Sequence, residues 1–290
     1  MSILVSINCI TYNHEEYIAD AIESFLMQKT DFDFEIIIGE DCSLDGTRKI
    51  IEGYVIKYPS KIKLITSEKN VGADENDRRV HANSNGKYIA VCEGDDYWTD
   101  PFKLQKQVTY MENNPNCTMC FHSAEIVRAN KRKTGRIMRP YNKSTVCPTE
   151  DIIIGGGSFC PTQSLMYLKR LMDNPPEFLM KAPTGDYPLQ MLVASSGYAY
   201  YIDEVMSSYR IGVKGSWTET TKTREKTLVH CEEVIAMLDD FNEYSKYKFS
   251  YAITKTKSQV NLYAEQYPSN AYIRLLSIKD RIREIIYSIY

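Results

Sequence analysis

Residues 86–98 read GKYIAVCEGDDYW, and this stretch decides the fold. Its first half is a short apolar run, which is typical of a strand buried on both faces of a parallel sheet. Glu93, Gly94, Asp95 and Asp96 follow it directly. In open α/β sheets, ligands bind beyond the carboxyl ends of the strands. An acidic turn at this point is therefore a candidate binding site.

Strand-like and helix-like runs alternate on both sides of that stretch. This alternation predicts an α/β domain with a largely parallel sheet flanked by helices. Strands are expected over residues 3–10, 34–38, 62–66, 87–92 and 118–127. Helices are expected over residues 18–26, 48–57, 74–84 and 102–113, and a further helical run ends at Ala194.

The regular pattern lapses after residue 127, over a stretch rich in basic side chains. Two interpretations stay open, a solvated loop and a mobile flap that meets an anionic substrate. The basic residues are Arg128, Lys131, Arg132, Lys133, Arg136 and Arg139.

The length of 290 residues fits one large domain with an appendage. We expect the domain to span residues 1–217 and a helical extension rich in Tyr and Lys to span residues 218–290. Residues 275–289 carry an apolar stripe at helical spacing. Such a stripe is typical of core or of a partner helix, and less often of a helix lying on a membrane.

Composition and charge exclude several classes of protein. The 35 basic and 38 acidic side chains give a net charge of -3, which argues against a nucleic-acid partner. No run reaches the roughly 20 apolar residues of a membrane span, and the N-terminus lacks the basic region of a signal peptide. We therefore expect a cytoplasmic protein.

The eight cysteines fit a reducing compartment. Cys117 and Cys120 have the spacing of zinc ligands, with His122 nearby, but no second pair follows. A buried strand is the better interpretation of that segment.

The first predicted strand ends in Thr11, Tyr12, Asn13 and His14. This turn is neither the G-x-G-x-x-G of a dinucleotide fold nor the phosphate loop of an NTPase, so both classes are excluded. What remains is a sheet edge rich in carboxylates. Such an edge suits a hard divalent cation shared between protein and substrate phosphates.

Five motifs in order resemble those of the family-two inverting glycosyltransferases, which have the GT-A fold and use nucleotide sugars. The resemblance runs from about residue 3 to residue 217. The motifs are VSINCITYN at residues 5–13, IGEDCSLDGT at 38–47, KNVG at 69–72, GKYIAVCEGDD at 86–96 and PTGDY at 183–187.

The resemblance implies a role for each motif. Residues 1–100 would form the nucleotide-sugar-binding half and residues 101–217 the acceptor half. Asp41 would contact the base, usually uracil, and Asp95 would hold Mg²⁺ or Mn²⁺ with help from Glu93. The other residues implied on the donor side are Thr11, Tyr12, Asn13, Asn70, Arg79, Gly94, Arg210 and Lys214. Those implied on the acceptor side are Asp96, Trp98, Tyr187 and Trp217.

Asp186 would be the general base that takes the proton of the acceptor hydroxyl. General-base help is typically worth roughly 10² to 10⁴ in rate. The sequence departs from the family at two positions: Glu93 replaces a commoner Asp, and Gly212 replaces a histidine that many relatives have.

The resemblance thus implies transfer of one sugar from a nucleotide sugar, most often UDP-linked, to a saccharide or lipid-linked acceptor in cell-surface polysaccharide or glycan assembly. The Q-x-x-R-W motif of processive synthases is absent. Contact with the inner face of the membrane, or dimerisation, through the C-terminal helices stays open. Two other functions stay open as well, a sugar nucleotidyltransferase and a non-catalytic module that binds nucleotide sugars.

Overall fold

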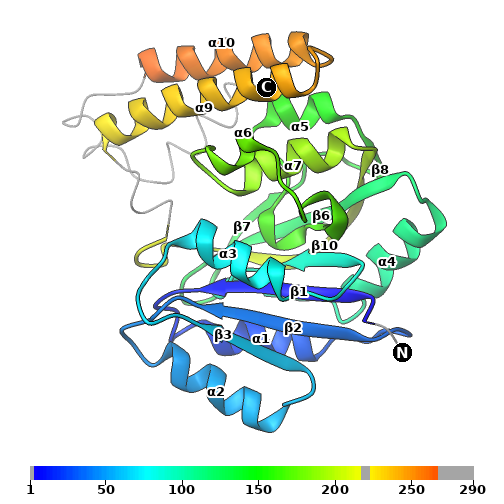
Figure 1. Ribbon diagram of the computed structural model, residues 1–290, viewed down its shortest axis with the longest axis vertical. Coiled ribbons are helices and arrows are strands. Elements are labelled where there is room, and N and C mark those ends of the chain that lie inside the picture. The colour runs from blue at the N-terminus through cyan, green and yellow to red at the C-terminus, as the bar shows by residue number, and fades with distance from the viewer. Residues whose placement is uncertain (1–2, 217–222, 267–290) are drawn as a thin grey trace.

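The computed structural model describes residues 3–216 and 223–266 (Figure 1). Trp217 and the apolar stripe at 275–289 lie outside the described residues. None of the helices in the described ranges combines the length and apolarity that a membrane crossing requires.

One mixed sheet of ten strands runs through the described part of the chain, in the order β3-β2-β1-β4-β9-β6-β10-β5, with β7 beside β6 and β8 beside β10. The strands β3, β2, β1 and β4 are parallel, whereas β9, β5, β7 and β8 are antiparallel to their neighbours. The strands are β1 (Val5–Thr11), β2 (Phe34–Glu40), β3 (Ile62–Thr66), β4 (Tyr88–Val91), β5 (Tyr97–Trp98), β6 (Cys117–Arg128), β7 (Lys133–Met138), β8 (Thr145–Cys147), β9 (Met166–Leu168) and β10 (Tyr198–Ile211).

Helices cover both faces of this sheet. Strand β1 shows why, because Val5, Ile7 and Cys9 pack against α1 while Asn8 between them bonds Ser84 just after α3. The helices are α1 (Ile18–Leu26), α2 (Thr47–Lys57), α3 (Ala73–Ala82), α4 (Lys103–Asn113), α5 (Thr149–Gly155), α6 (Glu177–Met180), α7 (Asp186–Ser195), α9 (Arg224–Tyr244) and α10 (Ser250–Gln266).

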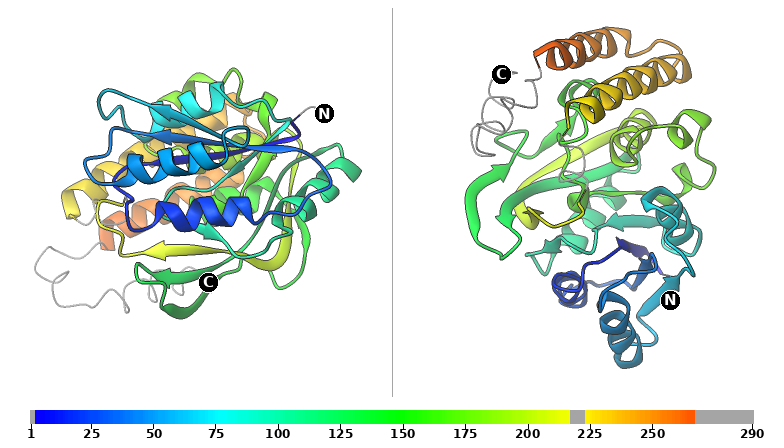
Figure 2. Two further views of the ribbon diagram at one scale, coloured as in Figure 1. Left: turned by 90° about the horizontal axis from the view of Figure 1, so that it is seen from below. Right: turned by 90° about the vertical axis from the view of Figure 1, so that its left-hand side faces the viewer.

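Two apolar cores result, one on each face of the sheet. The first joins α1, α2 and α4 to the sheet. The second joins α5, α7, α9 and α10 to the opposite face. Helices α9 and α10 form the outermost layer over α5 and α7, at the end of the molecule opposite α2 (Figures 1 and 2). The predicted helical character of the chain beyond Trp217 is thus confirmed for α9 and α10.

The prediction of an irregular segment after residue 127 is wrong. Strand β7 pairs with β6 as a hairpin, and β8 pairs with β10. Three basic side chains of the segment after residue 127 form ion pairs with carboxylates and are therefore not free to bind an anion. Lys131 pairs with Asp20 at 2.6 Å, Lys133 with Glu125 at 3.0 Å and Arg139 with Asp203 at 2.5 Å. Sequence periodicity missed the strands because β8 has only three residues and β7 is a half-exposed edge strand.

Candidate functional site

The acidic turn after β4 lies beside the turn that ends β1, because these two strands are neighbours in the sheet. Gly94 shows how closely the two turns approach. A Cβ atom at this position would lie 2.5 Å from Thr11 Oγ1 and 3.0 Å from His14 Nδ1. Only glycine therefore lets the acidic turn pack against residues 11–14.

Carboxylates gather around this turn and act on one another. Burial raises the pKa of Glu93, and the nearby charges of Asp95, Asp186 and Asp77 raise it further. Burial and the charge of Asp95 likewise raise the pKa of Asp96 well above its ordinary range. Mutual repulsion of this kind stores free energy that a bound cation would release.

Asp186 is the first residue of α7, and its charge also acts on Glu93. Its Oδ1 accepts a hydrogen bond from the backbone N–H of Tyr187 at 2.7 Å, and its Oδ2 accepts one from the Thr162 hydroxyl at 3.2 Å. Burial nevertheless raises the pKa of Asp186. A raised pKa makes a carboxylate a stronger proton acceptor.

Asp96, Arg210 and Asp20 form a network of hydrogen bonds and an ion pair, called the joint below, that supports the acidic turn. The backbone N–H of Arg210 donates to Asp96 Oδ1 at 2.7 Å, and its guanidinium donates to the carbonyl oxygen of Asp95. The guanidinium also pairs with Asp20 of α1 at 2.7 Å, and it lies between the rings of Tyr17 and Tyr97.

The side chain of Arg210 is fully buried. We therefore expect Arg210 to hold the acidic turn in place, rather than to meet a diphosphate as the resemblance implied. Lys214, by contrast, is exposed between Gly212 and Gly215, both of which have positive φ angles.

The predicted donor-side residues at the end of β1 come together. Thr11 is buried, and its hydroxyl lies 3.1 Å from His14 Nδ1. Asn13 has a φ of 56°, and its Oδ1 accepts a hydrogen bond from the backbone N–H of Leu44 at 2.7 Å. Tyr12 is exposed beside them. The first strand turn is thus tied to the loop after β2.

Asp41 has more partners within the protein than its predicted role required. Its two carboxylate oxygens accept hydrogen bonds from the backbone N–H groups of Val71 at 2.8 Å and Gly72 at 2.9 Å. The Ser67 hydroxyl donates a third at 3.1 Å. Asp41 therefore organises the turn that carries Asn70, and its contact with a base stays a prediction.

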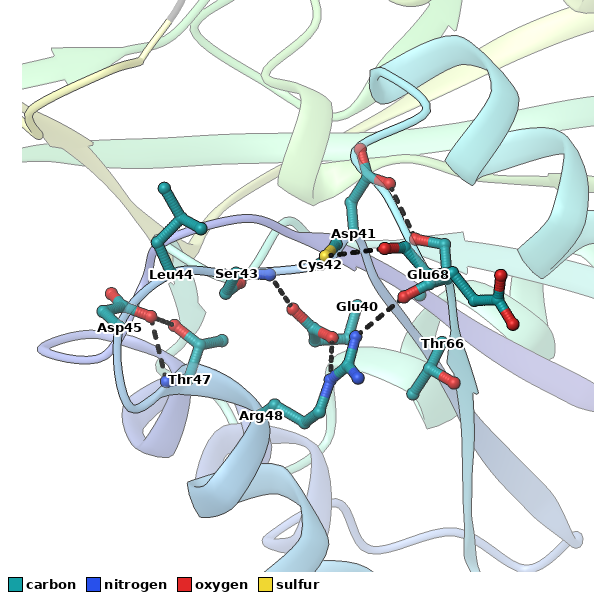
Figure 3. A network of polar contacts seen from close by, with 12 residues as sticks. Glu40, Asp41, Cys42, Ser43, Leu44, Asp45, Thr47, Arg48, Thr66 and Glu68 are labelled. Atoms are coloured by element: carbon teal, nitrogen blue, oxygen red, sulfur yellow. Dashed lines mark hydrogen bonds and ion pairs between the residues drawn. The ribbon is translucent and has the colours of Figure 1, made fainter.

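The sequence analysis assigns no role to Glu40, which directly precedes Asp41. It is fully buried and pairs with Arg48 of α2 at 2.5 Å, while its other oxygen accepts from the backbone N–H of Ser43 (Figure 3). A charged residue at the end of an apolar strand, eight residues before an arginine, is too common a pattern to reveal such a pair.

The remaining donor-side residues lie along the next turn and helix. Asn70 is exposed, and its Oδ1 accepts a hydrogen bond from the backbone N–H of Gly72 at 3.1 Å. Arg79 of α3 donates to the carbonyl oxygen of Thr66, and its Nη1 is buried without a hydrogen-bond partner in the described residues. One end of the Arg79 guanidinium is therefore bound to the protein, and the two N–H groups of Nη1 lack an acceptor in the described residues.

Two predicted acceptor-side residues are wrongly assigned. Trp98 is 1% exposed, packs edge-on against Phe25 and donates its indole N–H to Gln163 O. Tyr187 is 4% exposed and donates its hydroxyl to Ile153 O. Both side chains are core residues that an acceptor cannot reach. Position in a motif does not reveal which way a side chain points.

Three further residues interact with the carboxylates of the candidate site through their charges. Asp77 of α3 and Tyr209 of β10 both interact with Glu93. Burial lowers the pKa of His230 of α9, and the charges of Glu233 and Asp186 oppose this effect. Tyr209 directly precedes Arg210, whereas Asp77 and His230 lie outside the motifs and left no sequence signal.

The donor set suits a cation that is shared with a substrate. No group of three His, Cys, Asp or Glu side chains in the described residues could hold a metal ion alone. Cys117, Cys120 and His122 are buried in β6, in keeping with the strand interpretation. Mg²⁺ and similar ions commonly bind one or two carboxylates and complete their shell with substrate phosphates and water. Glu93 and Asp95 fit that pattern.

Solved structures share this fold. TarS of S. aureus (residues 1–349) in complex with UDP-GlcNAc matches with a TM-score of 0.69 at 16% identity, over 96% of this chain and 78% of TarS. The mannosyltransferase PcManGT from Pyrobaculum calidifontis, in complex with GDP-Man and Mn²⁺, matches with a TM-score of 0.60 at 13% identity, over 97% and 81%. The predicted GT-A fold is confirmed.

Sequence relatives point to the same family. An uncharacterized protein of Mycobacterium tuberculosis is 34% identical over 223 residues, which are 77% of this chain and 63% of the relative. The chain therefore spans less than two thirds of that relative's length. The profile of glycosyl transferase family 2 matches residues 6–170, which is more than half of the 290 residues. On this ground the chain belongs to glycosyl transferase family 2.

Proposed function

We propose that the protein is a metal-dependent, inverting glycosyltransferase that moves one sugar from a UDP sugar to an acceptor hydroxyl. The observation that carries the proposal is the mutual electrostatic influence of Glu93, Asp95 and Asp186. It supports an arrangement in which the candidate metal-binding turn and the candidate base share one space at the strand ends.

The donor nucleotide would lie along the turns that follow β1, β2 and β3. Thr11, Tyr12 and Asn13 would contact the nucleoside, and Asp41 would accept from the ring N–H of uracil. Asn70, Arg79 and Lys214 would border the nucleotide and its diphosphate. The close packing at Gly94 supports this arrangement, since it leaves the ends of β1 and β4 facing the same space.

Asp95 and Glu93 would hold a divalent cation, Mg²⁺ or Mn²⁺. When bound, the cation supplies positive charge that stabilises the leaving diphosphate. The repulsion that raises the pKa of Glu93 supports this assignment, because a cation between the carboxylates would relieve it. The complex of PcManGT with GDP-Man and Mn²⁺ supports the use of a metal within this fold.

Asp186 would accept the proton of the acceptor hydroxyl while that oxygen attacks the anomeric carbon from the side opposite the leaving group. A single displacement needs one such base and inverts the configuration. The Thr162 hydroxyl and the Tyr187 N–H would orient the carboxylate. Asp96 would support the turn rather than contact the acceptor, because its Oδ1 is already bound by Arg210.

The acceptor would be a saccharide or lipid-linked glycan, and the reaction a step in polysaccharide assembly on the cytoplasmic side of a membrane. The position of α9 near Asp186 supports an acceptor site bounded by the C-terminal extension.

The proposal can be tested in two steps. A thermal-shift screen of UDP, GDP and TDP sugars with Mn²⁺ should single out a UDP sugar, because a ligand bound only to the folded chain raises its melting temperature. Incubation of that sugar with a saccharide panel should then release UDP and form a product of inverted configuration. Release of pyrophosphate from UTP and a sugar phosphate would instead establish a nucleotidyltransferase. Binding without hydrolysis or transfer would leave a binding module.

A further inference from the structure

His14 faces the proposed metal-binding turn from the end of β1, and no motif assigned it a role. We propose that His14 and Asp95 are the two side chains that ligate the cation directly, with Glu93 acting through metal-bound water, so that the site prefers a divalent transition ion to Mg²⁺. This inference rests on the proposed metal-dependent function. It also identifies the class of cation, which that proposal leaves open.

The distance between the two side chains fits two ligands of one ion. His14 Nε2 lies 3.9 Å from Asp95 Oδ2, which is too long for a hydrogen bond. Metal–nitrogen and metal–oxygen bonds are about 2.0–2.2 Å long, so neighbouring ligand atoms on one ion are roughly 2.8 to 3.6 Å apart, and the two side chains would approach each other by a few tenths of an ångström on binding. The two side chains are 15% and 12% exposed, which leaves both accessible to a small ion.

The other ring nitrogen of His14 is held in the manner of a metal-binding histidine. Nδ1 lies 3.1 Å from the hydroxyl of Thr11. Ligating histidines commonly donate this N–H to a neighbouring acceptor, which fixes the ring and leaves the lone pair of Nε2 for the metal. In the described residues, Nε2 has no hydrogen-bond partner of its own. The ring is thus oriented by Thr11, and its Nε2 lone pair remains available to bind a metal ion.

The backbone around His14 is also fixed. Its N–H donates to the Thr47 hydroxyl at 2.8 Å, which ties the β1 turn to the start of α2. Gly94 provides the space in which the ring approaches the acidic turn. The position of the imidazole therefore follows from the fold and not from a flexible side chain.

A nitrogen ligand changes which ion binds best. Mg²⁺ takes oxygen ligands almost without exception. Affinity for a mixed nitrogen and oxygen site rises from Mn²⁺ to Co²⁺ along the first transition row. We therefore expect affinities in the order Mg²⁺, Mn²⁺, Co²⁺ from weakest to tightest, in the presence of UDP.

The test uses Mn²⁺ as the probe, because its electron spin reports directly bound nitrogen. In the full chain with UDP and Mn²⁺, electron spin echo envelope modulation should show ¹⁴N coupling, and labelling with ¹⁵N-histidine should replace it. His14→Gln should lose this coupling and bind Mn²⁺ at least about 10-fold more weakly. Its affinity for Mg²⁺ should change less. His81→Gln is the matched control, because His81 lies in the last turn of α3 and pairs with Asp173.

Each outcome has one meaning. A wild-type protein that binds Mn²⁺ with UDP but shows no histidine coupling overturns the role of His14 and leaves the proposed function intact. Coupling that persists in His14→Gln does the same. A wild-type protein that binds no divalent ion with UDP overturns both. If His14→Gln fails to fold, the ¹⁵N-histidine exchange in wild type, compared with His81→Gln and His230→Gln, still decides the question, because the fourth histidine, His122, is fully buried in β6.

Discussion

Two opposing influences act on the carboxylate of Asp186 at the start of α7. Its carboxylate accepts two hydrogen bonds from the protein, which favour the ionised form, and burial outweighs them and raises the pKa. The first turn of a helix also favours a negative charge at this position. A carboxylate that is oriented and yet more basic than usual is well suited to accept a proton.

Asp186→Asn should abolish most of the transfer without harming the donor site. The amide cannot take up a proton, so kcat should fall by about 10² to 10⁴. The Kd for UDP with Mn²⁺, measured by titration calorimetry, should stay within about twofold, because Asp186 lies outside the proposed donor contacts. Asp173→Asn, an exposed acid near α3, is the control. Wild-type kcat in Asp186→Asn would refute the assignment of the base.

Lys103 makes stability depend on pH. Its side chain is fully buried above the ring of Trp98, at 3.9 Å from the ring centroid, and its Nζ has no hydrogen-bond partner in the described residues. Burial lowers its pKa to about 7 from an ordinary value of 10.5. Between these two values the unfolded chain binds a proton that the folded chain does not, so the free energy of unfolding should rise with pH.

Lys103→Met should therefore be more stable than wild type near pH 7. The advantage should shrink by up to about 1.4 kcal/mol per pH unit towards pH 10, as wild type recovers. Urea denaturation of both proteins across this range measures the difference, in which other titrating groups cancel. An advantage that does not change with pH would mean that Lys103 keeps its proton in the folded state.

Single residues differ in how much the sequence could reveal about them. The acidic turn is recognisable in the sequence because it directly follows a buried apolar strand, and the role of Asp186 is implied by the family resemblance; both roles stay predictions. The burial of Trp98 and Tyr187 could not be predicted, because it depends on which side of a strand or helix faces the core. The sequence places His14 in the turn after the first strand but assigns it no role, because its proximity to Asp95 exists only once β1 and β4 are paired.

At the scale of elements, the joint beneath the acidic turn connects parts of the chain that are remote in sequence. Asp20 of α1 receives the buried guanidinium of Arg210 from β10 and the exposed ammonium of Lys131 from the turn before β7. Arg210 in turn holds Asp95 and Asp96. The geometry of the proposed metal site thus depends on α1.

Asp20→Asn should weaken metal binding through this joint. The substitution leaves a buried arginine without its counter-ion, which typically costs about 3–5 kcal/mol of stability. It should also raise the Kd for Mn²⁺ with UDP by about 10- to 100-fold, as loss of a supporting partner does at metal sites.

Lys131→Met is the matched control for Asp20→Asn. It removes the exposed partner of the same carboxylate, and exposed ion pairs are worth about 1 kcal/mol at most. Titration calorimetry and urea denaturation of both variants provide the readout. Equal losses of metal affinity in the two variants would show that Arg210 does not act through Asp20.

Elements were predictable where they are long and regular. Strands β1 to β4 follow from short apolar runs, and helices α1 to α4 follow from apolar residues that recur at helical spacing. Strand β7 was missed because its exposed fractions alternate without an apolar face, as its pattern of Lys, Thr, Gly and Arg shows. Pairing with β6 defines it as a strand, and pairing is a tertiary property.

At the scale of the whole molecule, two cores share one sheet. The side chains of β10 alternate between them, with Ile202 and Met206 in the first and Ala199 and Tyr201 in the second. Helices α9 and α10 belong to the second core through Phe241, Phe249 and neighbouring residues. We therefore expect the chain up to Gln266 to unfold as one cooperative unit.

Phe241→Ala should destabilise the whole molecule. Phe241 is fully buried and stacks on Phe249 at a centroid distance of 5.9 Å. Removal of its ring should lower the free energy of unfolding by about 3–5 kcal/mol. Tyr251→Ala on the neighbouring helix should change it by no more than about 0.5 kcal/mol, because Tyr251 is 81% exposed.

Circular dichroism and tryptophan fluorescence should report the same transition in both variants. An early loss of helix in Phe241→Ala, with the fluorescence of the first core unchanged, would identify α9 and α10 as an independent unit.

The place of α9 and α10 in the second core has a consequence for synthesis of the protein. These helices emerge from the ribosome after α5 and α7, although they cover apolar side chains of those two helices. Translation of the roughly 50 residues that separate Ser216 from Gln266 takes a few seconds at about 5–20 residues per second. For that interval the nascent chain carries an uncovered apolar surface, which is a substrate for chaperones.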